Sequence, residues 1–427
     1  MGGNQMEILT TGEKIKRARV YLNLTLKELC ESEISMSKMS CIENNKIEAE
    51  EWILKLVSER LQVPFNYLNE TAEEQIKNNI ETIKKDPKNS NYEENIKYNM
   101  DYAESMQSYK LCLELMHLLY NYYLEVDKLE NIEVLNFRYY DLYQKSCNEE
   151  EKVNYFMDKG RYLCRRKEYI QADTYFENLR TEIIDKKELT KQDYNNYIMI
   201  SYYSIYCKEQ LGQYDDAYEK AIDAINHLDK ADDEEYKANI YQILSIICLT
   251  LDKDEFPVYR DKYLNSIQVE KIDKSHTILK YGEISIKKGK VTEGKEYINH
   301  AISQFPSDDN RERTKFMLYC LELFVKYEFI AEAQEICDEV VNESISLDDV
   351  KFIEKAYYFK SIILQKKNSY ISAEMYMNLS LDALRKFGGR SELYKRYMEM
   401  GKMYYKMQEV AESIKYFDLA MKLEKKI

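Results

Sequence analysis

Apolar residues recur every third or fourth position along most of this chain, the spacing that places them on one face of an α-helix. The pattern predicts an all-α protein. It changes character along the chain, with short helices over residues 1–70, one narrow apolar stripe over 71–95, and longer amphipathic helices over 96–427. These three segments are the predicted domains.

Residues 11–68 predict a small bundle of five short helices whose starts are marked by capping residues. Thr25 and Glu28 spell T-x-x-E, a capping box in which each side chain satisfies a backbone N–H. Ser35 is placed to cap the third helix, and Pro64 to begin the fifth. Each helix is expected to bury an apolar face, made of Ile15, Ala18 and Leu22 in the first helix, Met39 and Ile42 in the third, and Ile53, Leu56, Val57 and Leu61 in the fourth.

The third helix presents a small, polar side opposite its core residues. Steps of about 100° from Met39 place Ser37, Ser40, Cys41 and Asn44 most nearly opposite the core. This side has the size and polarity of a helix that enters a DNA groove. The residues predicted to face DNA, on this helix and the two before it, are Ser35, Met36, Ser37, Lys38, Ser40, Cys41, Asn44, Arg17 and Lys27.

Residues 71–95 are predicted to form a linker with one docking helix and a hinge. Ile76, Ile80 and Ile83 make a narrow stripe among charged residues, and D-P-K-N-S-N at 86–91 then breaks the helix. A hinge here would let two copies of the first domain change their separation.

From residue 96 onward, helical hairpins repeat with fixed offsets. In six of them three small or apolar residues form a triplet, in which the second residue follows the first by twelve positions and the third follows the second by seven. The triplets are Gly160, Ala172 and Leu179; Ile205, Ala217 and Ala224; Gly282, Gly294 and Ala301; Leu321, Ala333 and Val340; Ser361, Ala373 and Ser380; and Gly401, Ser413 and Ala420. The period is 40 from Ala333 to Ala373, longer than the tetratricopeptide period of about 34, so the repeats are degenerate. Segment 96–150 fits the pattern worst, as an end repeat would.

The first helix of each hairpin is predicted to line the concave side of the solenoid. Its inward positions are rich in Asn, Gln, Tyr and Arg. Amides can donate to and accept from a peptide backbone, and Arg can hold a carboxylate with two parallel hydrogen bonds. An extended peptide is therefore the expected ligand, while the alternative is that these are solvated positions of polar helix faces. The residues assigned to the peptide are Asn154, Arg161, Arg165, Tyr202, Tyr206, Gln210, Asn239, Gln242 and Lys287.

Charge and composition argue against general nucleic-acid binding, metal binding and catalysis. A formal net charge of −14 makes the chain a poor general nucleic-acid binder, so any DNA contact must be local. Residues 1–46 hold seven Lys and Arg against six Asp and Glu, which predicts few phosphate contacts. The four histidines have no metal-ligand spacing, and no HExxH, Walker, GxGxxG or GxSxG motif is present. No catalytic residue, metal or cofactor is expected.

Cysteine usage and hydropathy predict a cytoplasmic protein. Nine cysteines are scattered without a C-x-x-C pair, a usage typical of reduced, buried thiols. The start MGGNQMEIL lacks the pattern of a signal peptide. The longest apolar stretch, at 243–251, is far shorter than the roughly 20 residues of a membrane span, and no membrane partner is expected. The 40 tyrosines are interpreted as packing between helices.

Four motifs in the first domain carry a resemblance. The run G-x-x-I-K-x-x-R, then T-L-K-E-L, then S-x-S-K-M-S-x-I-E-N, then L-x-V-P resembles the Cro/repressor-type helix-turn-helix over the first 68 residues. That family usually has Gln at the position of Leu26 and often Arg at that of Cys41, so this chain departs from it at two DNA-facing positions. The hairpins that follow resemble the tetratricopeptide repeat.

Together, the two halves resemble the peptide-responsive regulators grouped as RRNPP proteins, of the Rgg, NprR, PlcR, PrgX and AimR types. The resemblance implies a transcriptional regulator, a homodimer on a palindromic operator, whose solenoid binds a short signalling peptide in quorum sensing. In several members Asn residues hold the peptide backbone, which would match Asn154, Asn239 and Asn196 here. Two alternatives stay open: a Rap-like protein that binds or dephosphorylates a response regulator, and a protein-protein scaffold with a vestigial helix-turn-helix.

Overall fold

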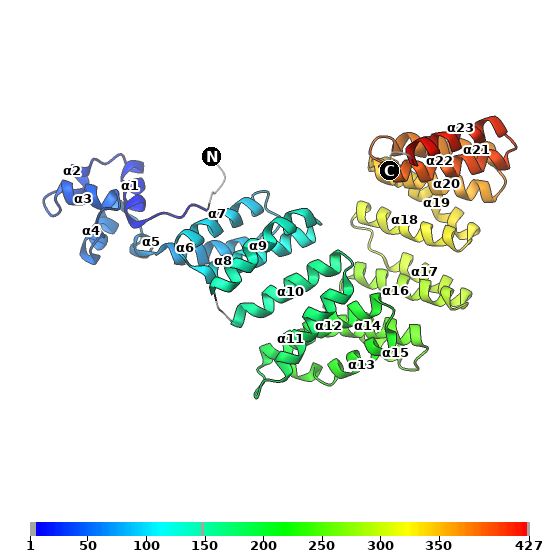
Figure 1. The fold of residues 1–427 in the computed structure, drawn as a ribbon. Helices are drawn as coiled ribbons and strands as arrows, with labels where there is room; N and C mark the ends of the chain where they lie inside the picture. The colour runs from blue at the N-terminus through cyan, green and yellow to red at the C-terminus, as the bar shows by residue number, and fades with distance from the viewer. Residues whose placement is uncertain (1–5, 147–148, 425–427) are drawn as a thin grey trace. The chain divides into compact units, whose positions relative to one another are not determined.

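A computed structural model describes residues 6–146 and 149–424 of the chain, and every regular element in them is a helix (Figure 1). The described residues form 23 α-helices and one short 3₁₀ helix, which confirms the prediction of an all-α fold. The chain divides into two compact units, residues 1–232 and 233–427. None of the helices described has both the length and the apolar content needed to cross a bilayer.

The first unit begins with a five-helix head. Its helices are α1 (Thr11–Tyr21), α2 (Leu26–Cys30), α3 (Met36–Glu43), α4 (Glu51–Leu61) and α5 (Phe65–Asn69). The predicted caps are confirmed, because Thr25 and Glu28 form the reciprocal capping box and Ser35 Oγ accepts from Lys38 N at 3.2 Å. A further box at Thr10 and Glu13 starts α1. Side-chain caps therefore set where three of these short helices begin.

The core of the head is built by the residues predicted for it, with two corrections. Ile15, Met39, Ile42, Ile53 and Val57 are buried in one cluster with Leu29 and Leu61. Leu22 was predicted to join them but is 40% exposed, because α1 ends at Tyr21 and Leu22 is its C-cap. Pro64 is the N-cap of α5 rather than its first residue.

The rest of the first unit is a series of helical hairpins. These helices are α6 (Ala72–Lys85), α7 (Tyr92–Ser105), α8 (Tyr109–Glu125), α9 (Leu129–Ser146), α10 (Glu149–Arg165), α11 (Tyr169–Ile184), α12 (Lys191–Gln210), α13 (Tyr214–Ile225) and the 3₁₀ helix η1 (Leu228–Lys230). The first helices of successive hairpins lie against one another, α6 on α8, α8 on α10 and α10 on α12. They form one layer, as the concave-side prediction requires.

The second unit continues with the same kind of hairpin. Its helices are α14 (Glu234–Leu251), α15 (Phe256–Leu264), α16 (Lys271–Lys287), α17 (Val291–Gln304), α18 (Asn310–Lys326), α19 (Ile330–Ser346), α20 (Val350–Lys366), α21 (Tyr370–Leu384), α22 (Arg390–Lys406) and α23 (Val410–Glu424). Within this unit α14 lies against α16, and α18 against α20.

The repeat triplets are all buried, which confirms the hairpin prediction residue by residue. Small residues let the two helices of a hairpin approach closely. A Cβ placed on Gly160 would lie 2.4 Å from the Phe176 ring, and one on Gly401 would lie 2.7 Å from Phe417. Where serine takes the small position it also bonds across the hairpin, as Ser361 Oγ donates to Ala373 O at 2.7 Å.

The structure also shows two hairpins that the sequence pattern missed. Helices α6 and α7 carry Ile80, Tyr92 and Asn99 at the same offsets of twelve and seven, and α8 and α9 carry Tyr120, Ile132 and Tyr139. All six residues are buried. The second position of the triplet is Gly, Ala or Ser in all six predicted hairpins but Tyr92 and Ile132 in these two, so a search for a small residue there passes over them.

Candidate functional site

A cavity of about 280 Å³ lies between three first-layer helices of the first unit, α8, α10 and α12. It is lined by Leu124, Arg161, Cys164, Arg165, Tyr202, Tyr203 and Tyr206. Four of the nine residues predicted for a peptide therefore meet in one place: Arg161, Arg165, Tyr202 and Tyr206. They meet because positions four apart on α10 and on α12 share a helix face, and the two faces lie side by side.

The cavity combines positive charge with aromatic surface. The Arg161 guanidinium lies 5.9 Å from the centre of the Tyr203 ring, and the Tyr202 and Tyr203 rings are 5.2 Å apart. Burial raises the pKa of Tyr206, so its hydroxyl stays protonated at neutral pH. Within residues 6–146 and 149–424, neither Arg161 nor Arg165 is paired with a carboxylate, although the whole chain has an excess of acid. The two guanidiniums are thus open to an anionic ligand.

Three lining residues were not predicted. Cys164 lies between the two arginines on the same helix face, and its Sγ is 3.4 Å from that of Cys207 on α12. Cys164 could have been predicted from the sequence, because a residue three positions after Arg161 lies on the same helix face. Tyr203 directly follows Tyr202, while Leu124 comes from the preceding hairpin and has no local signal at all.

The other residues predicted for the peptide lie outside this cavity. Asn154 donates to Glu151 at 3.2 Å, and Gln210 donates to Glu209 at 2.5 Å. In the second unit, Gln242 donates to Thr277 Oγ1 at 2.7 Å and to Tyr263 Oη at 3.2 Å, which holds α14 to α15 and α16. Asn239 is half-buried on α14, and Lys287 is exposed and pairs with Glu283 at 3.2 Å.

The predicted DNA face of the head is small and accessible. Met36, Ser37 and Asn44 are exposed, whereas Ser40 and Cys41 are half-buried. Asn44 Nδ2 donates to Ser40 O at 2.7 Å. Ser35 is exposed and serves as the cap of α3, and Lys27 is exposed on α2. Leu26, at the position where the Cro/repressor-type domains that the sequence resembles usually have Gln, packs against the head core.

Two of the three cations predicted for this face are already paired. Lys38 Nζ lies 2.7 Å from Glu50 Oε1 and 5.5 Å from the centre of the exposed Trp52 ring. Glu50 also accepts from Trp52 Nε1 at 2.6 Å, and these bonds lower the pKa of its carboxyl. Arg17 pairs with Glu7. The face therefore offers less free charge than its sequence suggests.

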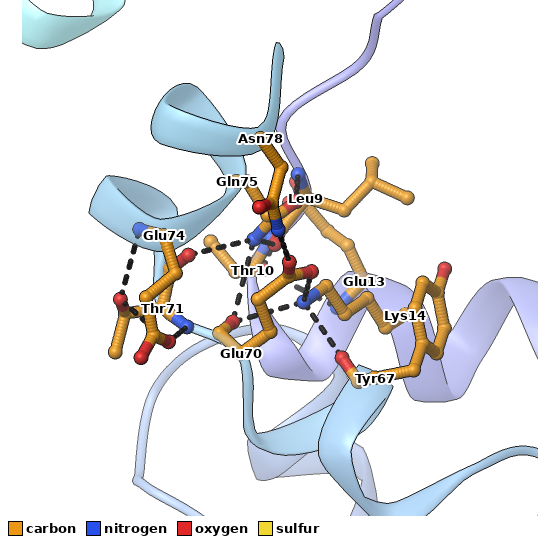
Figure 2. A network of polar contacts seen from close by, with 10 residues as sticks. All are labelled: Leu9, Thr10, Glu13, Lys14, Tyr67, Glu70, Thr71, Glu74, Gln75 and Asn78. Carbon is orange, nitrogen blue, oxygen red and sulfur yellow. Dashed lines mark hydrogen bonds and ion pairs between the residues drawn. The ribbon is translucent and has the colours of Figure 1, made fainter. Parts of the chain in front are cut away.

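A network of polar contacts fixes the head to α6 (Figure 2). Lys14 of α1 is 1% exposed, and its ammonium donates to Tyr67 O at 2.8 Å and to Glu70 O at 2.9 Å, with Glu70 Oε2 at 3.4 Å. Burial lowers the pKa of Lys14, and the Glu70 carboxylate opposes this effect. Glu70 in turn accepts from Asn78 of α6 at 2.6 Å.

The side-chain amide of Gln75 makes the second set of contacts at the junction between the head and α6. Gln75 of α6 accepts from Leu9 N at 3.0 Å and donates to Leu9 O at 2.9 Å, so it pairs with the backbone as a neighbouring strand would. Ile8 lies buried in one cluster with Ile76, Ile80 and Ile83. The stripe predicted for a docking helix is therefore buried, and residues 72–85 are packed on both the head side and the solenoid side.

Comparison with known proteins finds no matching family model and no matching curated protein. Solved structures similar to the chain include the apo quorum sensor NprR from B. thuringiensis, at 14% identity and TM-score 0.43 over 82% of this chain and 99% of that one. Bacillus thuringiensis PlcR, solved with the peptide PapR7 and DNA, matches at 15% identity and TM-score 0.29 over 68% of this chain and 98% of its own. Aspartyl phosphate phosphatase F from Bacillus subtilis matches at 15% identity and TM-score 0.41 over 99% and 96%.

NprR and PlcR are among the regulator types that the sequence resembles. Among the described residues, no group of His, Cys, Asp and Glu is arranged to hold a metal ion.

Proposed function

We propose that this chain is a DNA-binding transcriptional regulator whose helical repeats bind a short peptide with a carboxylate group. The observation that carries the proposal is the cavity between α8, α10 and α12, where two arginines that have no carboxylate partner among the described residues lie among three tyrosines. All four of the residues predicted there stand on first-layer helices.

The chemistry of the cavity suits a peptide better than a small polar metabolite. A guanidinium can take a carboxylate through two parallel hydrogen bonds, and tyrosine faces can pack against apolar side chains while their hydroxyls bond. A cavity of about 280 Å³ holds only part of a short peptide. The remaining peptide residues would extend along the first-helix layer.

The test is affinity capture of soluble random heptapeptides by the full chain, followed by mass spectrometry. Two pools are used, one with free and one with amidated carboxyl ends. We expect enrichment of peptides with a carboxylate, and loss of enrichment in the double variant Arg161→Ala, Arg165→Ala. Arg166→Ala is the matched control, because Arg166 follows directly but pairs with Glu133 and Glu168 outside the cavity. Equal enrichment by the double variant would contradict the assignment.

The head is the proposed output. A peptide that binds one curvature of the solenoid better than another shifts the population toward it and changes the spacing of two dimer-related heads. Half-sites about one DNA turn apart tolerate little change in that spacing. Selection from random DNA, with and without an enriched peptide, should yield a palindrome in one of the two conditions. If neither condition enriches a palindrome, the proposal that the chain is a DNA-binding regulator is wrong.

One observation favours a second candidate function. Lys38 and Arg17 are held by Glu50 and Glu7, so the head offers few free cations to DNA phosphates. This is also what is expected of a Rap-like protein whose solenoid binds a response regulator and whose head is secondary. Co-purification of the full chain with isolated receiver domains separates the two, since a regulator of the proposed kind retains none of them.

A further inference from the structure

A line of polar contacts runs from a buried carboxylate to the wall of the cavity. Asp158 of α10 is fully buried; its Oδ2 accepts from the Tyr139 hydroxyl at 2.8 Å and lies 2.7 Å from His117 Nδ1. Asn121, one turn after His117 on α8, places its Nδ2 3.0 Å from His117 Nε2. The Asn121 Oδ1 accepts from Arg161 Nη1, which lines the cavity.

The direction of each bond follows from its donors and acceptors. A carboxylate can only accept, so His117 Nδ1 carries the proton that faces Asp158. The Asn121 Nδ2 lies 3.2 Å from Nδ1 and 3.0 Å from Nε2, so the NH₂ group lies against the ring as a whole, and it also donates to His117 O at 2.9 Å. This fixes the Asn121 amide with its oxygen toward Arg161. The arginine is held in the cavity, and no carboxylate among the described residues takes its remaining N–H groups, which can therefore bond a ligand.

A second proton on His117 reverses this arrangement. The protonated ring carries a positive charge and an N–H group at both nitrogens, so it would repel the Asn121 NH₂ group that lies against it. Rotation of the amide relieves the conflict by turning Oδ1 to the ring, but the NH₂ group then faces the Arg161 guanidinium, which is itself only a donor. When the amide rotates or moves away from the protonated ring, Arg161 loses its hydrogen bond to Asn121 Oδ1.

We propose that His117 and Asn121 are positioning residues for Arg161, and that protonation of His117 releases this arginine and weakens binding of a carboxylate-bearing ligand in the cavity. The proposal rests on the proposed peptide site and adds a proton as its regulator. His117 and Asn121 act through Arg161 and line no part of the cavity themselves.

The surroundings of His117 set the pH range of this effect. Burial opposes a charge on the ring, but the Asp158 carboxylate outweighs it and raises the pKa of His117 above the ordinary value. The other charged groups that face the ring are Arg161 and Glu151 of α10, which oppose one another, and the Tyr139 hydroxyl of α9 faces the shared Asp158 oxygen. Release of Arg161 is therefore expected to begin at a higher pH than for an exposed histidine.

The first test measures affinity against pH for the full chain and one heptapeptide from the enriched pool that carries a free carboxylate. Between about pH 8.5 and 5.5 we expect wild-type affinity to fall about tenfold, the size of one lost hydrogen bond to a charged group. Asn121→Ala should bind weakly and equally across this range. His300→Gln, on exposed α17 surface in the other unit, should keep the wild-type slope. Retention of that slope by Asn121→Ala would overturn the proposal.

The second test needs no peptide, so it separates failure of this proposal from failure of the peptide site. In the ¹⁵N-arginine-labelled full chain, the Arg161 Nε–H signal is assigned with Arg161→Lys. Its protection factor, which is the intrinsic exchange rate at each pH divided by the observed rate, should fall as the pH falls through the titration of the His117 ring, which is followed in ¹³C-histidine-labelled protein. An Arg161 signal whose protection does not change through the His117 titration refutes the coupling even if peptide binding is established.

Discussion

Cations of the head are largely used inside the molecule. Lys14 donates to backbone carbonyls of Tyr67 and Glu70, and Arg19 makes a two-point pair with Glu43, with Nε–Oε1 at 2.6 Å and Nη2–Oε2 at 2.8 Å. Glu43 is 4% exposed, so the pair ties α1 to α3 within the core. A count of charges along the sequence therefore overstates what is left for DNA phosphates.

Release of Lys38 should strengthen DNA binding. In Glu50→Gln the lysine loses its carboxylate partner and becomes available to a phosphate. We expect tighter binding of a selected operator and a steeper dependence on salt, with the logarithmic slope increased by about 1 per head. Fluorescence anisotropy at several salt concentrations measures both. Glu48→Gln removes the same charge nearby without freeing Lys38, and an equal gain in that variant would show a general charge effect only.

Glu93 should make stability depend on acid pH. It lies 2.6 Å from Lys97 and accepts from Tyr123 Oη at 2.7 Å, and these bonds lower its pKa to about 2. A carboxyl whose folded pKa is lowered stabilises the fold above its unfolded pKa of about 4.3, and this contribution is lost as the pH falls toward the folded value. Because solvent screens this partly exposed pair, Glu93→Gln should reduce the free energy of unfolding at pH 7 by about 1 kcal/mol, and by much less near pH 2.

Urea unfolding of both chains across that pH range checks this prediction. Glu94→Gln, at the adjacent exposed position, provides the control. A difference between Glu93→Gln and wild type that stays constant with pH would show that the bonds to Lys97 and Tyr123 do not depend on ionised Glu93.

At the scale of elements, hairpin geometry depends on single side chains at the crossing point. Gly160 faces Phe176, and Gly401 faces Phe417, each sixteen positions later on the second helix of its hairpin. In the hairpins α6–α7 and α8–α9 bulky residues occupy the equivalent positions and are still buried. The offset is thus the constant feature of this repeat, and the size of the side chain is not.

Gly160→Ala should destabilise the first unit. The added Cβ would lie 2.4 Å from the Phe176 ring, so the ring or α11 must shift. We expect a loss of about 1–3 kcal/mol, the usual cost of overpacking a core, measured by thermal or urea unfolding. Gly389→Ala is the control because its nearest neighbour would be 3.8 Å away. Equal effects of the two substitutions would indicate that loss of glycine itself, rather than the contact, is responsible.

At the scale of the whole molecule, the head is joined to the repeats by a packed helix. Gln75 pairs with the Leu9 backbone, and Ile8 is buried among residues of α6. The first unit accordingly extends from the head through η1. A hinge at residues 86–91 stays a prediction, and α6 on its N-terminal side lies against both α7 and α8.

The isolated head should bind the operator more weakly than the full chain. A fragment of residues 1–70 lacks Gln75 and the isoleucines that cover Ile8, and it lacks the solenoid proposed to hold the dimer. We expect at least about a tenfold loss of affinity, because two linked heads bind with a shared entropy cost. A fragment of residues 1–105 restores the junction alone and separates the two causes. Equal binding by residues 1–70 and the full chain would contradict the dependence on a dimer.

Local features of the molecule could be predicted from the sequence because they depend on residues close together in the chain. The capping pair Thr25 and Glu28, the buried face of α3 and the six repeat triplets follow from spacings within one helix or one hairpin. Two pairs of cavity residues, Arg161 with Arg165 and Tyr202 with Tyr206, were predicted for the same reason, since each pair lies on one helix face.

Other features were decided by the tertiary structure, because they depend on which side chain meets which across helices. Leu124 reaches the cavity from another hairpin, and Asn121 and His117 stand behind Arg161 on a helix about forty residues away. Glu50 and Glu7 pair with Lys38 and Arg17, so these two cations of the predicted DNA face are less available to phosphates than the sequence indicates. A periodic pattern tells which way a side chain points on its own helix, and only the packed fold brings its partner to it.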